Sequence, residues 1–204
     1  MTPSRSRTLR FLALAGLLIS SGSAVGQALP PPKEVRVSGL PSLMARTQEV
    51  SDVLLTSLDT IFHDRSVCCG KDSALEDSAA RADPSSLKDV ATKLQGRHLL
   101  SDGRPIVVKA EYMEPSAINF SALIGTFREK HALLMEWNSH LYVVYGVAYY
   151  ETMDYETGTI TDAIQKILLL DTRYSDSRRT VTFERGTDDW GKVQGLVYLA
   201  VDPS

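Results

Sequence analysis

One cysteine, one histidine and one aspartate in this chain have the types and the order that a thiol acyl-transfer site requires. Cys69 follows a second cysteine at position 68, His140 begins the apolar run HLYVVYGVAY, and Asp171 ends the run KILLLD. In such a site a thiolate attacks a carbonyl carbon, an imidazole moves the proton, and a carboxylate orients the imidazole. The three residues therefore predict nucleophilic catalysis on an acyl carbon, provided that the fold brings them together.

The two cysteines, Cys68 and Cys69, are the only ones in the chain, and they are adjacent. A disulfide framework is excluded by this number, and neighbouring cysteines close only a small, strained ring. A thiol kept in a chain with no other cysteine needs a reason, and reactivity is one such reason. A buried, unreactive thiol and a redox switch at the vicinal pair are the alternatives.

The reactivity of Cys69 depends on where the following helix begins. A helix N-terminus and a nearby imidazolium lower the pKa of a thiol from its free value of about 8.5. The segment from Ser73 to Glu76 has the form of a capping box, which would leave Cys69 outside the first turn. Asp64 or Ser66 as the cap would place it inside. The sequence leaves both starts open.

His140 and Asp171 each have a structural alternative. A histidine at the start of an alternating strand lies at a sheet rim, either as a general base or as a solvent-facing residue beside a turn. Asp171 follows a buried run, where a charge needs a partner. A bond to His140 would fix the imidazole tautomer, and the alternative is a cap of the turn into Thr172. His98 and His131 are expected at the surface or in turns. No recognised metal-ligand spacing is present, so we predict no metal and no cofactor.

The first 28 residues have the pattern of a secretory signal peptide. Its basic region holds Arg5, Arg7 and Arg10. The apolar part, 11–19, is too short to span a membrane, and small or polar residues follow it. We expect cleavage after Ala28, with Ala24 as the alternative site. The mature protein would then be periplasmic or extracellular without a stable membrane anchor, whereas an uncleaved leader would keep it anchored.

The mature chain is long enough for one domain with its own core. We expect an extended lead-in over 29–42 and a single domain over 43–204. Removal of the leader takes the formal charge from -3 to -6, because three arginines leave with it. This acidic balance argues against nucleic acid as a partner.

Helical patterns come first in this domain and strand patterns come last. Helices are predicted over 43–62 and 73–82, from Asp83-Pro84 to Gly96, and after Ser116. Strands are predicted over 106–112, 132–137, 140–150, 166–171, 180–183 and 193–201, with Asn138-Ser139 as a tight turn. This order indicates an α+β fold with an antiparallel sheet.

The layout resembles the papain-like cysteine peptidases, and most of all their compact bacterial branch, the C39-like peptidases that process double-glycine leaders. Cys69, followed by glycine, lies at a loop-to-helix junction in the helical half. His140 begins an apolar strand that ends in glycine and an aromatic residue, and Asp171 closes the next one. The final strand follows an excursion that contains Trp190. The resemblance runs from about Val50 to the C-terminus.

This resemblance implies a papain-like fold, with N-terminal helices carrying the cysteine and a C-terminal sheet carrying histidine and aspartate. It implies Cys69 as nucleophile, His140 as base and Asp171 as the residue that orients His140. The family places a glutamine six residues before the nucleophile to donate to the oxyanion, and His63 stands there instead. Imidazole N–H can also donate. The charged residue Asp72 replaces the small residues usual after the nucleophile.

The implied function is that of an exported cysteine hydrolase that cleaves peptide or amide bonds in a peptide or protein substrate. Transfer of the acyl group to an amine uses the same parts. The missing glutamine and Asp72 favour an alternative, in which the domain keeps the fold as an inactive peptide-binding module. The vicinal redox switch is the third hypothesis.

Overall fold

The computed structural model describes residues 31–37, 50–63, 74–100, 102–173, 178–182 and 188–203 of the 204-residue chain. The side chains of 50–52, 63, 178–180 and 203 are not among the described parts. The chain divides into two compact units, Met1–Pro31 and Pro32–Ser204, and the account below concerns the second. The predicted signal peptide lies outside the described residues. No helix in the described ranges is long and apolar enough to cross a membrane.

The helices are α1 (Val50–His63), α2 (Ala74–Ala80), α3 (Leu87–Leu94) and α4 (Phe120–Arg128), with 3-10 turns η1 (Pro115–Ala117) and η2 (Trp190–Lys192). Two of them begin at side-chain caps that satisfy first-turn N–H groups. Ser86 accepts the N–H of Asp89 in α3, and Asn119 accepts those of Ser121 and Ala122 in α4. These caps explain where both helices start.

The strands are β1 (Lys33–Arg36), β2 (Gly96–Leu99), β3 (Pro105–Met113), β4 (Leu133–Trp137), β5 (His140–Met153), β6 (Ile160–Leu170), β7 (Arg178–Thr182) and β8 (Val193–Pro203). They form one sheet in the order β2-β3-β8-β4-β5-β6-β7, and all its described pairs are antiparallel. β1 pairs with the later part of β5, on residues 146–149, beyond the part that pairs with β4. The last strand, β8, thus lies inside the sheet.

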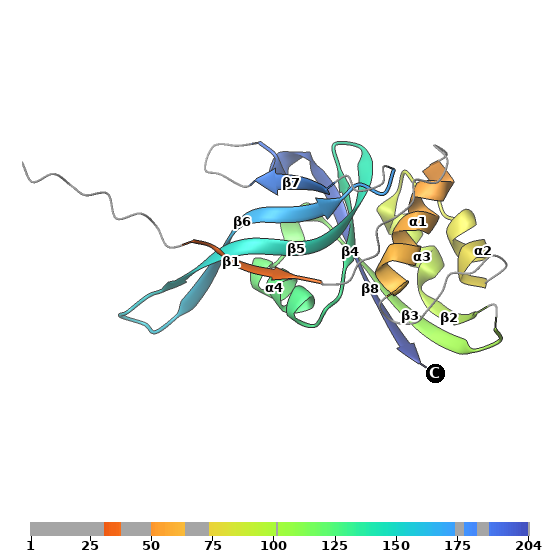
Figure 1. Ribbon diagram of the computed structural model, residues 1–204, viewed down its shortest axis with the longest axis horizontal. Coiled ribbons are helices and arrows are strands. Elements are labelled where there is room, and N and C mark those ends of the chain that lie inside the picture. The colour runs from red at the N-terminus through yellow and green to blue at the C-terminus, as the bar shows by residue number, and fades with distance from the viewer. Residues whose placement is uncertain are drawn as a thin grey trace, which may run out of the picture. The chain divides into compact units, whose positions relative to one another are not determined.

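The core lies between this sheet and the helices. In Figure 1, α2 and α3 lie beside β2 and β3, α1 packs against α2 and β5, and α4 lies beside β1 and β5. The helices bury their apolar faces against alternate residues of the strands. Fully buried members of this core are Leu54, Leu58, Phe62, Leu94, Ile124, Phe127, Leu133, Leu134, Met135 and Tyr142.

The predicted α+β class and antiparallel sheet are confirmed, as is each predicted helix within its described part. Three boundaries differ. The helix expected to begin at Asp83-Pro84 begins at Leu87, with Ser86 as its cap. It ends before Gly96, as expected, and Gly96 begins β2 with a φ of 126°. Pro115–Ala117 forms a 3-10 turn, so Asn119 and not Ser116 caps α4. β6 begins at Ile160, earlier than the predicted strand over 166–171. β1 lies in the predicted lead-in and was not expected as a strand.

Candidate functional site

His140 is exposed at the rim of the sheet, directly after the tight turn that joins β4 to β5. Asn138 and Ser139 both have positive φ, 53° and 59°, which is the backbone of a type I′ hairpin turn. The Ser139 N–H donates to the Gln194 side chain, and the Asn138 N–H donates to the Lys192 carbonyl. These bonds fasten the turn to η2 and to the start of β8, and they hold His140 at a defined place.

The ring of His140 is oriented by its own chain neighbour. Its Nδ1 lies 2.8 Å from the carbonyl oxygen of Ser139. A carbonyl only accepts, so Nδ1 carries the hydrogen, and in the neutral ring Nε2 keeps its lone pair. This tautomer can take up a proton at Nε2, which is the chemistry expected of a general base.

Asp171 is fully buried at the end of β6 and is paired with Arg173. The Arg173 Nε donates to one carboxylate oxygen at 2.8 Å, and Nη2 donates to the other at 2.6 Å. The backbone N–H of Arg173 adds a third bond at 3.2 Å. The same guanidinium lies 5.9 Å from the ring centroid of Tyr142 on β5. The carboxylate therefore caps the turn that follows β6, as one sequence interpretation proposed.

The register brings His140 and Asp171 to neighbouring strand ends. The last pair of the β5–β6 ladder joins Val143 to Leu170, so Tyr142 and Asp171 follow on the same face. His140 lies two residues before Tyr142, at the start of β5, and shares that face because side chains alternate along a strand. Within the described residues no hydrogen bond joins His140 to Asp171. Ser139, and not Asp171, accepts from the imidazole.

Helix α1 is fastened next to Asp171. The hydroxyl oxygens of Ser57 and Thr172 lie 3.0 Å apart in a buried contact, and Ser57 also donates to the Val53 carbonyl at 2.7 Å. His63 is the last residue of α1, and its side chain is not described. Cys69, with its neighbour at 68, lies outside the described residues. The predictions for the nucleophile, the oxyanion donor and the redox switch therefore stay predictions.

The other two described histidines, His98 and His131, make contacts that belong to the fold and not to the candidate site. His98 is buried in β2, and its Nε2 lies 2.7 Å from the Leu94 carbonyl, so its predicted surface position was wrong. His131 is half-buried and packs edge-on against Tyr198, with ring centroids 5.4 Å apart. Across the described ranges, no group of three or more potential metal ligands lies close together.

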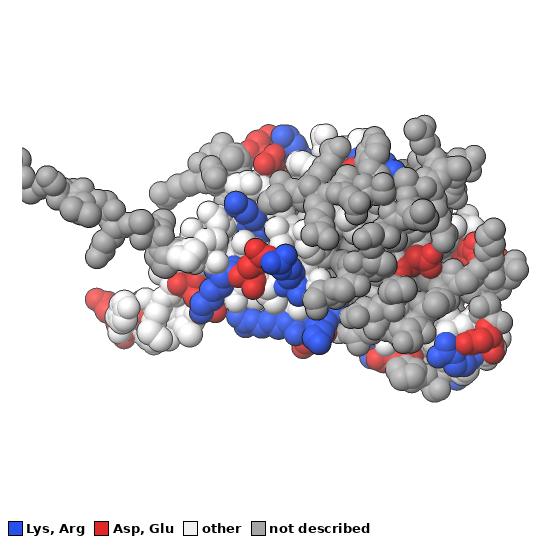
Figure 2. All heavy atoms as spheres, viewed as in Figure 1, with Lys and Arg blue, Asp and Glu red and all other residues white. Residues whose placement is uncertain are grey.

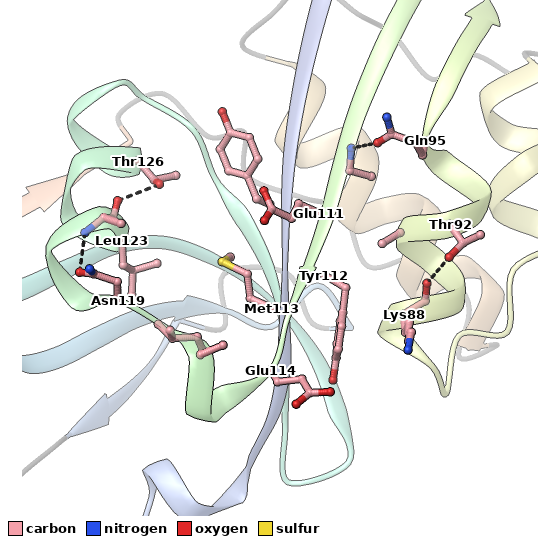
Figure 3. Close-up of a pocket in the computed structure, with 16 residues that line it drawn as sticks. Lys88, Thr92, Gln95, Glu111, Tyr112, Met113, Glu114, Asn119, Leu123 and Thr126 are labelled. Atoms are coloured by element: carbon pink, nitrogen blue, oxygen red, sulfur yellow. Dashed lines mark hydrogen bonds between the residues drawn. The ribbon is translucent and has the colours of Figure 1, made fainter.

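A groove of about 1010 Å³ lies along β3, between α3 and α4, and the sequence did not predict it (Figure 3). Neither His140 nor Asp171 lines it. The strand and both helices were predicted, but local patterns do not show which edge of a strand stays without a neighbour. The only sequence signal was the polar residues Glu111 and Glu114, next to apolar residues of the strand.

The groove has a negative end at Tyr112. Burial raises the pKa of the Tyr112 hydroxyl, and the nearby carboxylates of Glu114 and Glu136 raise it further. Burial also raises the pKa of Glu136 on β4. The Tyr112 hydroxyl donates to the Gln194 carbonyl at 3.2 Å. This end of the groove is suited to a positively charged group.

No protein-family profile, curated protein or solved structure matches the chain. The argument for function therefore depends on the residues and their geometry. Two regions carry that argument: the strand ends that hold His140 and Asp171, and the groove along β3.

Proposed function

We propose that the chain is an exported cysteine hydrolase with a papain-like fold, which cleaves peptide or amide bonds through Cys69 and His140. One observation supports this proposal above the others. Ser57 of α1, the helix that leads into the cysteine segment, contacts Thr172, which directly follows Asp171. Asp171 in turn ends the strand paired with the one that His140 begins. The helical half and the two strand ends thus belong to one region.

In the proposed reaction the Cys69 thiol gives its proton to Nε2 of His140, and the thiolate attacks the substrate carbonyl carbon. The tetrahedral oxyanion accepts hydrogen bonds from the Cys69 N–H or from His63. The C–N bond then breaks, and the leaving amine takes the proton from His140. Water, activated by the same Nε2, attacks the thioester and releases the carboxylic acid and the free thiol.

The Ser139 carbonyl orients His140 in this mechanism, because it accepts the Nδ1 hydrogen at 2.8 Å. Asp171 contributes its negative charge from the neighbouring strand end, where Arg173 fixes the carboxylate. In this proposal the Asp171–Arg173 pair holds the turn after β6 beside the strand end that carries His140. The predicted direct bond between the imidazole and Asp171 is not among the described hydrogen bonds, since the Ser139 carbonyl accepts from Nδ1.

The surroundings of Asp171 and His140 also favour a second function. Arg173 binds both oxygens of the Asp171 carboxylate, and no described hydrogen bond joins that carboxylate to His140, which is exposed to solvent. These are properties expected of an inactive peptidase-like domain that binds peptides. The two functions differ in the reactivity of the thiol.

Alkylation by iodoacetamide at about pH 7 separates them, because only a thiolate with a lowered pKa reacts fast there. The hydrolase predicts labelling at Cys69 by peptide mapping, with the rate lowered about ten-fold or more in His140→Ala. His131→Ala serves as the matched histidine control and should leave the rate unchanged. Equal, slow labelling in wild type and His140→Ala would overturn the hydrolase and support the binding module.

A further inference from the structure

The groove follows an open edge of β3. β2 pairs with the first part of β3, from Pro105 to Val108, and β8 pairs with β3 on the other side as far as Met113. From Lys109 to Met113 no strand of the described chain lies on the side of β2. The Gln95 side chain, just after α3, accepts the Ala110 N–H at 2.7 Å and so closes one position of this edge.

The free part of the edge centres on Tyr112. In an antiparallel pair the peptide groups of alternate residues point to the same side. The Ala110 N–H points away from β8 to Gln95, so the N–H and C=O of Tyr112 point away from β8 as well. One donor and one acceptor, spaced as in a sheet, thus face the groove. An extended backbone is the partner that fits both.

The walls leave room for the side chains of such a backbone. Figure 3 shows Tyr112 directed toward the α3 side of β3 and Met113 toward the α4 side. Small residues line both helices there, Ala91 and Thr92 on α3 and Ala122 on α4. A strand added to β3 would place alternate side chains against the two helices, as strand pleating requires.

The charges select the kind of peptide. Glu111 and Glu114 line the groove and are exposed, and Glu136 acts on Tyr112 from β4. Lys88 is the cation among the described lining residues. The two lining carboxylates, Glu111 and Glu114, outnumber this one cation. Glu114 and Glu136 both lie near the Tyr112 hydroxyl. A basic side chain on the peptide is complementary to this end of the groove.

We propose that the groove binds an extended peptide segment carrying lysine or arginine, which adds to β3 as a strand at Tyr112 and directs its basic side chains to Glu111 and Glu114. The proposal goes beyond the hydrolase, because it requires neither Cys69 nor His140. It holds equally for an active enzyme and for an inactive binding domain.

The probe is a short fluorescein-labelled peptide that repeats Lys-Lys-Val, which places lysines on both faces of an added strand, and its binding to the full chain is measured by fluorescence anisotropy. The lysine peptide should bind, and a peptide with glutamate in place of lysine should not. Methylation of the backbone nitrogens on one edge should weaken binding about ten-fold or more, because it removes the ladder bonds.

Two sets of variants of the chain test the site itself. The double change Glu111→Gln and Glu114→Gln should weaken the lysine peptide about five-fold. Glu156→Gln, an exposed carboxylate on the β5–β6 hairpin, is its control. Ala122→Arg should block the groove and abolish binding, whereas Ser121→Arg, beside it on α4 but outside the groove, should not. Circular dichroism checks that the variants fold.

Three results would overturn the proposal. The first is equal binding of the lysine and glutamate peptides, which would remove the charge argument. The second is undiminished binding of the methylated peptide or of the Ala122→Arg variant, which would place the peptide elsewhere. The third is a dimer without peptide that Ala122→Arg dissociates, which would make a second copy of the chain the occupant of the groove.

Discussion

Asp171 is a carboxylate that the fold takes completely out of water. A buried charge is tolerated when it is paired and hydrogen-bonded, and removal of one partner leaves the other uncompensated. Arg173 supplies both the charge and two side-chain bonds, and its own side chain is mostly buried. The pair therefore contributes to the stability of the turn after β6, whatever its part in function.

Replacement of Arg173 by leucine should lower the free energy of unfolding by about 3 kcal/mol, because Asp171 would lose its guanidinium in a buried place. Urea denaturation measures the change. Arg97→Leu, at an exposed position of β2, is the control and should change stability by less than about 0.5 kcal/mol. Similar losses in the two variants would contradict the buried ion pair.

Glu136 has the opposite property, since burial raises its pKa and disfavours its charged form. The folded chain then holds this proton more tightly than the unfolded chain does. The resulting stability is present below the ordinary glutamate pKa and is lost as pH rises through the raised value. At neutral pH the charged Glu136 therefore opposes folding.

Glu136→Gln should accordingly be more stable than the wild type at about pH 7, and the difference should vanish at about pH 3, where both side chains are neutral. Denaturation at the two pH values measures this. A difference that is the same at both would show that side-chain shape, and not charge, is responsible.

The sequence predicted the rim position of His140, with solvent exposure as one alternative, and the need of Asp171 for a partner. It did not identify Arg173 as that partner, because two residues in a turn face each other only for particular backbone angles. The orienting role of Ser139 escaped prediction for a similar reason. The group that orients the ring is the main-chain carbonyl of Ser139, and the type of side chain at that position does not predict such a bond.

At the scale of elements, β1 depends on a glycine in β5. The register joins Arg36 to Gly146, and a Cβ at Gly146 would lie 2.6 Å from the Val35 carbonyl oxygen. Side chains add to the docking, since Lys33 forms an ion pair with Glu151. Figure 2 shows Lys and Arg atoms directly against Asp and Glu atoms on the face it presents.

Gly146→Ala should detach β1, because the backbone of Val35 and Arg36 cannot yield as a flexible side chain does. We expect a loss of about 1–3 kcal/mol and faster amide hydrogen exchange in Lys33–Arg36. Gly125→Ala is the matched control. It lies in α4 with open space at its Cβ, and it should stabilise the chain by about 0.5–1 kcal/mol. Unchanged exchange in β1 after Gly146→Ala would count against this account.

Elements with long local patterns, such as α1 and β5, were predicted from the sequence. β1 and β2 escaped prediction because each has four residues and little alternation. Each forms only because it pairs with a longer strand: β1 pairs with β5, and β2 pairs with β3. Such pairing energy comes from distant parts of the chain and leaves little trace in a short segment.

Across the whole molecule, several exposed carboxylates have lowered pKa values. A hydrogen bond from the Ser85 hydroxyl lowers the pKa of Asp83. Backbone N–H groups lower the pKa of two others: the N–H of Arg104 acts on Asp102, and the N–H of Glu156 acts on Asp154. A hydrogen bond from Lys33 does the same for Glu151. Groups with depressed folded pKa values stabilise the fold above their ordinary values, and that stability is lost as pH falls through the folded ones.

The free energy of unfolding should therefore be smaller at about pH 3 than at about pH 7. Added salt should reduce the difference, because exposed charges are screened. Urea denaturation with and without salt at the two pH values measures both effects. Glu136 acts in the opposite direction, so its glutamine variant should show the steeper loss in acid. Stability that stays constant over this range would contradict the prediction.

The α+β class follows from the order of helical and strand patterns, whereas the strand order does not. β8, the last strand, lies between β3 and β4, although the chain makes it long after both. Nothing in its apolar run distinguishes an edge strand from an inner one. The groove along β3 has the same origin, because it exists where β2 ends and β8 continues.

The pairing of Lys33 with Tyr149 also sets an order of assembly during synthesis. A ribosome releases β1 before any other strand, yet its seat on β5 exists only after most of the domain has emerged. Until then this short segment has no place to bind, and closure of so long a loop is slow. The first strand to be synthesised is thus among the last to pair. In a nascent chain that stops before Gly146, β1 would have no strand to pair with.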